Sequence, residues 1–193
     1  MAYLDTNVII GYCFPQDRNY PNAVRLMKKL RELGIERFYS SPLTLVELYS
    51  YISRNIDSIE LPPELRELVP TKTLKVRIIV KACASELPQP VTFISDTEGL
   101  LDVEAIYGVA NIKMFHKFAK ALKLAPELQI PTLDLLHLIY AKQVLDHVKY
   151  FATLDTAIIK KAEVIEKVLG VKVIGVLPTP SLELQSSQLS LTT

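Results

Sequence analysis

Short apolar segments alternate with amphipathic segments along most of the chain, and this alternation constrains the fold more than any other feature. Residues 1–4, 37–41, 149–155 and 171–176 are apolar runs of strand length, and each of the first three is followed by a helical pattern. Strands of this uniformly apolar kind belong to parallel sheets that are covered on both faces. We therefore expect a three-layer α/β/α sandwich with a central, mainly parallel sheet.

The helical segments carry start and stop signals. Residues 20–34 place apolar side chains on one face and end at Gly34, and Pro42 stands where the first turn of the next helix tolerates it. A strongly apolar helix is expected to begin at Pro131, and residues 156–170 read as one helix that Gly170 stops.

The domain organisation follows from length and from a change of pattern in the middle. A chain of 193 residues fits one globular domain, here residues 1–176. Between about residues 56 and 126 the alternation lapses into helix-like runs, including 71–87 and 100–124, so we expect a largely helical insertion. Residues 177–193 have little to bury and are expected to form a mobile tail.

Composition excludes little. The formal net charge of +1 gives no global attraction for nucleic acid, so such binding would need a local patch. Cys13 and Cys83 match no metal-ligand spacing, and we expect them to be buried thiols in a reducing cytoplasm. No apolar run approaches the ~18 residues of a membrane span, so a membrane association is not expected.

Four acidic residues stand in apolar surroundings. Asp5 and Asp155 lie where apolar strands end, and Glu47 and Asp134 lie inside apolar helical patterns. Carboxylates in such places are costly unless they are paired, hydrogen-bonded or bound to a cation. Asp5 and Asp155 could also cap the helices that follow them, whereas Glu47 and Asp134 have no such explanation.

Convergence of these acids would favour a divalent cation. In parallel sheets ligands bind at the carboxyl ends of the strands, where Asp5 and Asp155 are expected. Oxygen ligands select Mg²⁺ or Mn²⁺, and such ions serve in-line displacement at phosphorus. Thr6 and Asn7 could orient a carboxylate or a water beside Asp5.

Four segments resemble, in order, the motif blocks of the PIN-domain family. The first is an apolar strand ending in Asp, Thr and Asn; the second a Ser-x-x-Thr-x-x-Glu helix; the third an apolar helix opened by Asp; the fourth a Thr-x-Asp strand end. These segments are YLDTNVIIGY (3–12), SPLTLVELYS (41–50), PTLDLLHLIYAKQ (131–143) and FATLDTAIIKKA (151–162). The match covers roughly residues 1–55 and 127–176, and it leaves the insertion unmatched.

The resemblance implies a metal-dependent ribonuclease acting on single-stranded RNA. Asp5, Glu47, Asp134 and Asp155 would hold Mg²⁺ or Mn²⁺ and carry the reaction, with Thr6, Asn7 and Thr153 in support. The biological role stays open between a VapC-type toxin with an antitoxin partner, a housekeeping RNA-processing nuclease, and a non-catalytic RNA-binding or assembly module. The family also implies a homodimer.

Other residues carry two interpretations. Lys113, Lys117, Lys120 and Lys123 are expected on one face of a helix, with Phe115 and Phe118 among the apolar residues opposite; the lysines could track phosphates or simply face solvent. His137, one turn after Asp134, could hold a carboxylate or be a structural histidine. Tyr51, one turn after Glu47, could stack on a base or lie in the core.

Overall fold

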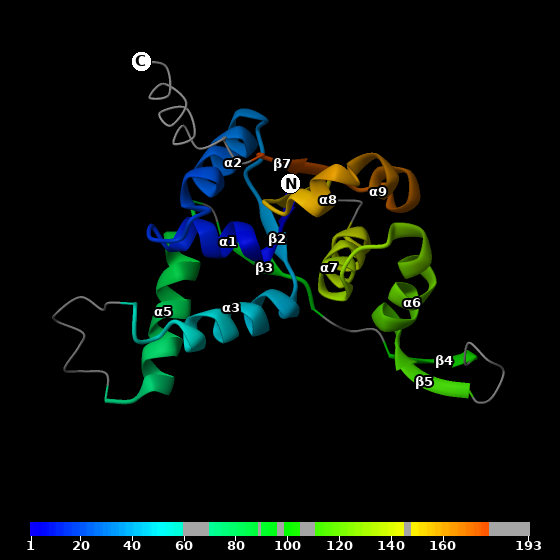
Figure 1. Ribbon diagram of the computed structural model, residues 1–193, viewed down its shortest axis with the longest axis horizontal. Coiled ribbons are helices and arrows are strands. Elements are labelled where there is room, and N and C mark those ends of the chain that lie inside the picture. The colour runs from blue at the N-terminus through cyan, green and yellow to red at the C-terminus, as the bar shows by residue number, and fades with distance from the viewer. Residues whose placement is uncertain (60–69, 89, 96–98, 105–110, 145–147, 178–193) are drawn as a thin grey trace, which may run out of the picture.

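A five-stranded parallel sheet forms the centre of the molecule (Figure 1). Its strand order is β3-β2-β1-β6-β7. The computed structural model describes residues 1–59, 70–88, 90–95, 99–104, 111–144 and 148–177. The expected α/β class with a parallel sheet is confirmed. The strands of this sheet are β1 (Ala2–Leu4), β2 (Phe38–Ser40), β3 (Val91–Phe93), β6 (Tyr150–Thr153) and β7 (Lys172–Gly175).

Helices cover both faces of the sheet and give three layers, with eight helices among the described residues. Alternate residues of β1 point into two separate cores, Ala2 and Leu4 into one and Tyr3 into the other. The first core is closed by α1 (Thr6–Cys13), α2 (Tyr20–Glu32), α3 (Pro42–Arg54) and α5 (Lys72–Glu86). The second is closed by α6 (His116–Leu128), α7 (Thr132–Gln143), α8 (Thr156–Lys160) and α9 (Ala162–Leu169).

Helix boundaries follow local chemistry with one exception. Gly34 and Gly170 adopt positive φ values of 70° and 74°, as expected for residues that end helices. The single helix expected over residues 156–170 is instead divided at Lys161, whose Nζ donates to the carbonyls of Leu128 and Gln129 at 2.8 and 2.7 Å. Among the described residues, no helix has the length and apolar character needed to cross a membrane.

The insertion differs from the expected largely helical segment. Residues Leu100–Glu104 (β4) and Asn111–Phe115 (β5) form an antiparallel pair, and only then does α6 begin. Residues 90–95, whose sequence PVTFIS predicts a weak strand or extended piece, contain β3, which pairs with β2 and is the edge strand of the central sheet. The insertion is therefore part of the main sheet. Most of the proline-bracketed segment LPPELRELVP (61–70), and the expected tail beyond Leu177, lie outside the described residues.

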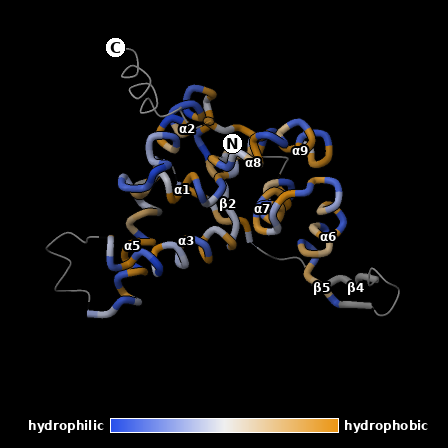
Figure 2. Tube along the Cα trace, in the orientation of Figure 1, coloured by the Kyte–Doolittle hydropathy of each residue, from blue (hydrophilic) through white to orange (hydrophobic). Residues whose placement is uncertain are grey.

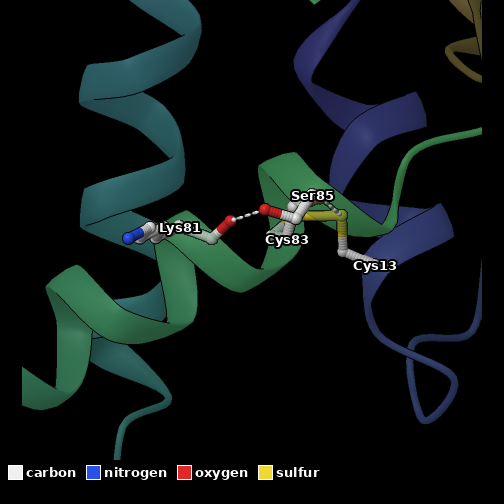
Figure 3. Close-up of a disulfide and its surroundings, with 4 residues drawn as sticks. All are labelled: Cys13, Lys81, Cys83 and Ser85. Carbon is white, nitrogen blue, oxygen red and sulfur yellow. Dashed lines mark hydrogen bonds between the residues drawn. A yellow bond between two sulfur atoms is a disulfide. The ribbon is translucent and has the colours of Figure 1, made fainter. Parts of the chain in front are cut away.

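Cys13 and Cys83 form a disulfide, so the expectation of two buried thiols is wrong (Figure 3). The Cα atoms are 5.3 Å apart, and the bond joins α1 to α5 across 70 positions of sequence. Sequence spacing carried no sign of this contact, because it is the packing of α5 beside α1 that brings the two sulfurs together. The disulfide also removes cysteine usage as an argument for a reducing compartment.

Candidate functional site

The candidate site lies at the carboxyl ends of β1 and β6, in the middle of the sheet. From β1 the chain builds β2 and β3 on one side, then returns to build β6 and β7 on the other side. Ligands of open parallel sheets bind at such a switch point, where the connections on either side diverge. Asp5 follows β1 directly, and Thr153 ends β6 beside it, as the Asp5 N–H donates to the Ala152 carbonyl at 3.0 Å.

Asp5 is buried and held by side chains from two strand ends. Its Oδ2 accepts from Asn7 Nδ2 at 2.6 Å and from Thr153 Oγ1 at 2.7 Å. Asn7 Oδ1 in turn accepts from the Leu154 N–H at 3.0 Å. Asp5 occupies the N-cap position of α1, but its side chain makes no capping hydrogen bond. The side chain thus serves the site and not the helix end.

Burial raises the pKa of the Asp5 carboxyl, although His137 and the Thr153 hydroxyl oppose the rise. The nearby Glu47 carboxylate adds to the rise. A nearby cation would stabilise the charged form of such a buried carboxylate.

Glu47 comes from the middle of α3 and points to the same place. Its Oε2 accepts from Thr6 Oγ1, and His137 Nε2 lies 2.8 Å from the same oxygen. Burial alone would raise the pKa of Glu47, but the hydrogen bonds from His137 and Thr6 outweigh it and bring the pKa below its ordinary value. Glu47 is therefore held as a carboxylate.

His137 links Glu47 to the floor of the site. Its ring is 1% exposed, its Nε2 meets Glu47, and its Nδ1 lies 2.7 Å from the Tyr3 hydroxyl and 3.3 Å from Ser41 Oγ. A tautomer that donates from Nε2 to Glu47 and accepts at Nδ1 from the Tyr3 hydroxyl accounts for the two shorter contacts. Both sequence interpretations thus describe part of its role, although the carboxylate it holds is Glu47 and not Asp134.

Asp134 is in the first turn of α7, half-buried and without a hydrogen bond among the described residues. Burial raises the pKa of this carboxyl to about 6, and the neighbouring carboxylates of Asp5, Asp155 and Glu47 add to the rise. All four acids expected from the sequence therefore interact electrostatically. The interaction of Asp134 with His137 opposes the rise in its pKa but does not cancel it.

Asp155 has a structural role as well. Its Oδ1 accepts from the N–H groups of Ala157 and Ile158 at 2.6 and 3.3 Å and so caps α8, which is the alternative interpretation of this residue. Its own N–H donates to Thr153 Oγ1 at 3.0 Å. Thr153 therefore connects Asp155 to Asp5.

Three of the four acids line one cleft of about 460 Å³, the acidic cleft: Asp5, Glu47 and Asp134. Tyr51 lines it too, with its hydroxyl donating to Asp17 Oδ2 at 3.0 Å. So does Arg54, which sequence reasoning missed. Arg54 follows Glu47 by seven positions, a spacing that puts both on one face of a helix, about 10 Å apart along its axis. That spacing was the available signal.

The carboxylate oxygens of the site are of the type that binds a hard divalent cation, but they are not grouped around one point. Carboxylate oxygens suit Mg²⁺ or Mn²⁺. Burial and, after it, the neighbouring carboxylates raise the pKa of Asp134, and a bound cation would favour its charged form. Within the described ranges, however, no three His, Cys, Asp or Glu side chains are grouped as a ready metal site. Glu47 and Asp155 each direct one oxygen to hydrogen-bond partners instead.

The four lysines do not form a stripe on one helix. Lys113 lies on β5, and Lys117, at 3% exposure, has its Nζ 4.6 Å from the centroid of the Tyr140 ring. Lys120 is half-buried and Lys123 is exposed. Phe115 and Phe118, expected on the apolar side, are instead 59% and 46% exposed.

No protein-family model and no curated protein sequence matches the chain. The functional argument therefore rests on the structure of the site. The site lies at the switch point of an α/β sandwich, where four carboxylates interact beside an arginine.

Proposed function

We propose that the chain is a PIN-type, Mg²⁺- or Mn²⁺-dependent endoribonuclease that hydrolyses phosphodiester bonds in single-stranded RNA. The observation that carries the proposal is the meeting of Asp5, Glu47 and Asp134 in one cleft at the switch point of a parallel sheet. The order of the four motif segments along the chain supports it.

In this proposal Asp5, Glu47, Asp134 and Asp155 hold the metal. When bound, a divalent ion supplies a more acidic water and neutralises charge on the phosphoryl oxygens. Asp5 is oriented for that role because Thr153 and Asn7 fix one of its oxygens. Glu47 is oriented by His137 and Thr6, which bind one of its oxygens and leave the other unengaged among the described residues.

Arg54 is the proposed phosphate-binding residue of the cleft. It lies on the same face of α3 as Glu47, and its Nε donates to the Ser50 carbonyl at 3.3 Å. A guanidinium beside an otherwise acidic surface suits a polyanionic strand, because it binds a phosphate next to the one that reacts. Single strands are favoured because a flexible chain can enter the cleft.

The biological role follows one of two routes. As a VapC-type toxin, the protein would act in the cytoplasm as a homodimer, and a small antitoxin would cover the cleft. As a housekeeping nuclease, it would process RNA chosen by the insertion. A neighbouring short reading frame for a DNA-binding antitoxin would favour the first route.

A non-catalytic RNA-binding module is the second candidate. It is favoured by one observation, namely that in the described part of the chain no three potential ligands are grouped around one point. Against it stands the mutual repulsion of four carboxylates, which only destabilises the cleft unless a cation enters.

Cleavage of single-stranded RNA with Mn²⁺ tests the proposal. We expect wild type to cut, EDTA to stop it, and Asp5→Asn and Asp134→Asn each to abolish cleavage. Glu163→Gln, an exposed acid on α9, is the matched control and should cut normally. Cleavage by either active-site variant at the wild-type rate, or an inert wild type with Mn²⁺ bound in calorimetry, would overturn the nuclease assignment.

A further inference from the structure

A second cavity, of about 230 Å³, opens beside the acidic cleft. We call it the aromatic pocket, and it is formed by residues from α3, the β5–α6 junction and α7. Its lining includes Leu43, Val46, Phe115, Lys117, Phe118 and Tyr140. Leu43 and Val46 line the acidic cleft as well, so the two cavities share a wall.

Two phenylalanines of the pocket expose much of their aromatic surface to solvent. Phe115 ends β5 and Phe118 lies in the first turn of α6; both are largely solvent-accessible, and the junction they occupy is hydrophobic in Figure 2. Val46, at 67% exposure, adds to the same surface. Contiguous exposed apolar area of this kind marks interaction sites on soluble proteins.

The lining of the pocket also carries a positive charge. Lys117 Nζ lies over the Tyr140 ring and lines the pocket, whereas the neighbouring cleft is dominated by carboxylates. A ligand for the pocket should therefore be flat and apolar on its faces, with electron-rich edge atoms. It should also be attached to a group that lies in the acidic cleft next door.

We propose that the aromatic pocket binds a nucleobase of the single-stranded RNA whose backbone crosses the acidic cleft. This inference rests on the proposed function. A base has a π-face that stacks on Phe115 or Phe118 and carbonyl or ring-nitrogen edges that suit the Lys117 ammonium. The volume fits one ring system, since pockets for drug-sized ligands begin at about 300 Å³.

The pocket would hold the base of one nucleotide beside the cut. Two of its walls come from residues 115–118, within the insertion, so this subsite belongs to this chain's own elaboration of the fold. Stacking on Phe115 or Phe118 would supply the affinity and tolerates any base. Leu43 and Val46 would separate the bound base from the phosphate in the acidic cleft.

The test measures binding in EDTA, so that it does not depend on cleavage. A fluorescein-labelled single-stranded RNA six nucleotides long is compared with a set in which each position in turn is abasic. We expect one abasic position to weaken binding to wild type about fivefold or more, the range of a base–aromatic stack. Phe118→Ala should weaken binding of the intact RNA by a similar factor.

The decisive result is non-additivity. In Phe118→Ala the sensitive abasic position should cost nothing further, because the two changes remove the same contact. Phe118→Trp should restore binding, and Phe118→Leu should not. Tyr49→Ala is the matched control, because Tyr49 is an exposed aromatic residue of α3 that lines neither cavity.

Two results would overturn the subsite. One is an equal, additive loss for Phe118→Ala and Tyr49→Ala. The other is a stable dimer in light scattering that Phe118→Ala dissociates, since a second copy would then cover the pocket. If the protein cleaves RNA but the losses of affinity are additive, the nuclease proposal holds and the subsite proposal fails. If the losses are non-additive but no RNA is cleaved, the subsite proposal holds and the nuclease proposal fails.

Discussion

The acidic cleft and the aromatic pocket share a wall, yet they are attached to the protein in different ways. In the cleft, Asp5 is hydrogen-bonded to Thr153 and Glu47 to His137, each from a distant segment, and Asp5 and Thr153 are buried. In the pocket, Phe115 and Phe118 stand in solvent at the end of an antiparallel pair. The acids proposed for catalysis are thus held in place by the sheet. The phenylalanines proposed for base binding can be substituted with little effect on the packing of the core.

The largest effect concerns the bond that ties the insertion to α1. Replacing both Cys13 and Cys83 by serine should lower the free energy of unfolding by about 4 kcal/mol, the chain-entropy value for a loop of this length. RNA affinity at 20 °C should not change, because neither cysteine lines a cavity.

Chemical denaturation with and without reductant measures this difference. Wild type should lose stability on reduction, and the double variant should be insensitive to reductant. If reduced and oxidised wild type unfold at the same denaturant concentration, the disulfide contributes nothing in solution.

The next effect is a difference in unfolding free energy between a variant of the acidic cleft and a variant of the aromatic pocket. His137→Ala leaves the buried Tyr3 hydroxyl and Glu47 without a partner and creates a void, so unfolding should become easier by about 3 kcal/mol. Phe118→Ala, at an exposed position, should cost less than about 1 kcal/mol.

Urea unfolding of both variants provides the comparison. His137→Gln is a useful companion, since it can keep one hydrogen bond and should fall between His137→Ala and wild type. Equal stability of His137→Ala and Phe118→Ala would show that the cleft is not tied to the core as described.

The smallest effect is a pH dependence that belongs to the cleft alone. Asp134 has its pKa raised to about 6 in the folded protein, against an ordinary 3.8 when unfolded. Between these values the folded state binds the proton more tightly, so metal-free protein should gain stability as pH falls from 8 toward 5 and lose it as pH rises through 6.

Asp134→Asn should remove this dependence and be more stable than metal-free wild type at pH 8. Thermal unfolding in EDTA at pH 8 and 5.5 measures both, with Glu163→Gln as control. Added Mn²⁺ should reverse the order at pH 8 by stabilising wild type more than the variant. A variant less stable than wild type at pH 8 in EDTA would contradict the repulsion among the four acids.

The parts of the fold that local patterns specify were predictable. Residues 1–55 and 131–176 carry apolar strands, prolines and glycines at helix ends, and acids at strand ends, and the structure places Asp5, Glu47 and Asp134 in one cleft. The segment 100–115 was not predictable, because its short apolar runs fit both a helix and two strands. Tertiary pairing decides between them, and it also buries Lys117 and exposes Phe118.

Contacts between distant segments escaped prediction for the same reason. The Cys13–Cys83 bond depends on where α5 packs. The binding of Glu47 by His137 depends on how α7 lies against α3, since 90 positions separate the two residues. Neither spacing carries information about three-dimensional distance.

The edge position of β3 has a consequence for protein engineering. A shortened protein that lacked residues 56–126, the insertion, would lose β3 and leave the backbone groups of β2 unpaired along an open sheet margin. Such a margin recruits strands from other molecules, so the trimmed protein should precipitate or form fibrils. The insertion therefore also protects the sheet edge from pairing with other molecules. A library that explores new specificities should vary residues 111–118 and leave Val91–Phe93 intact.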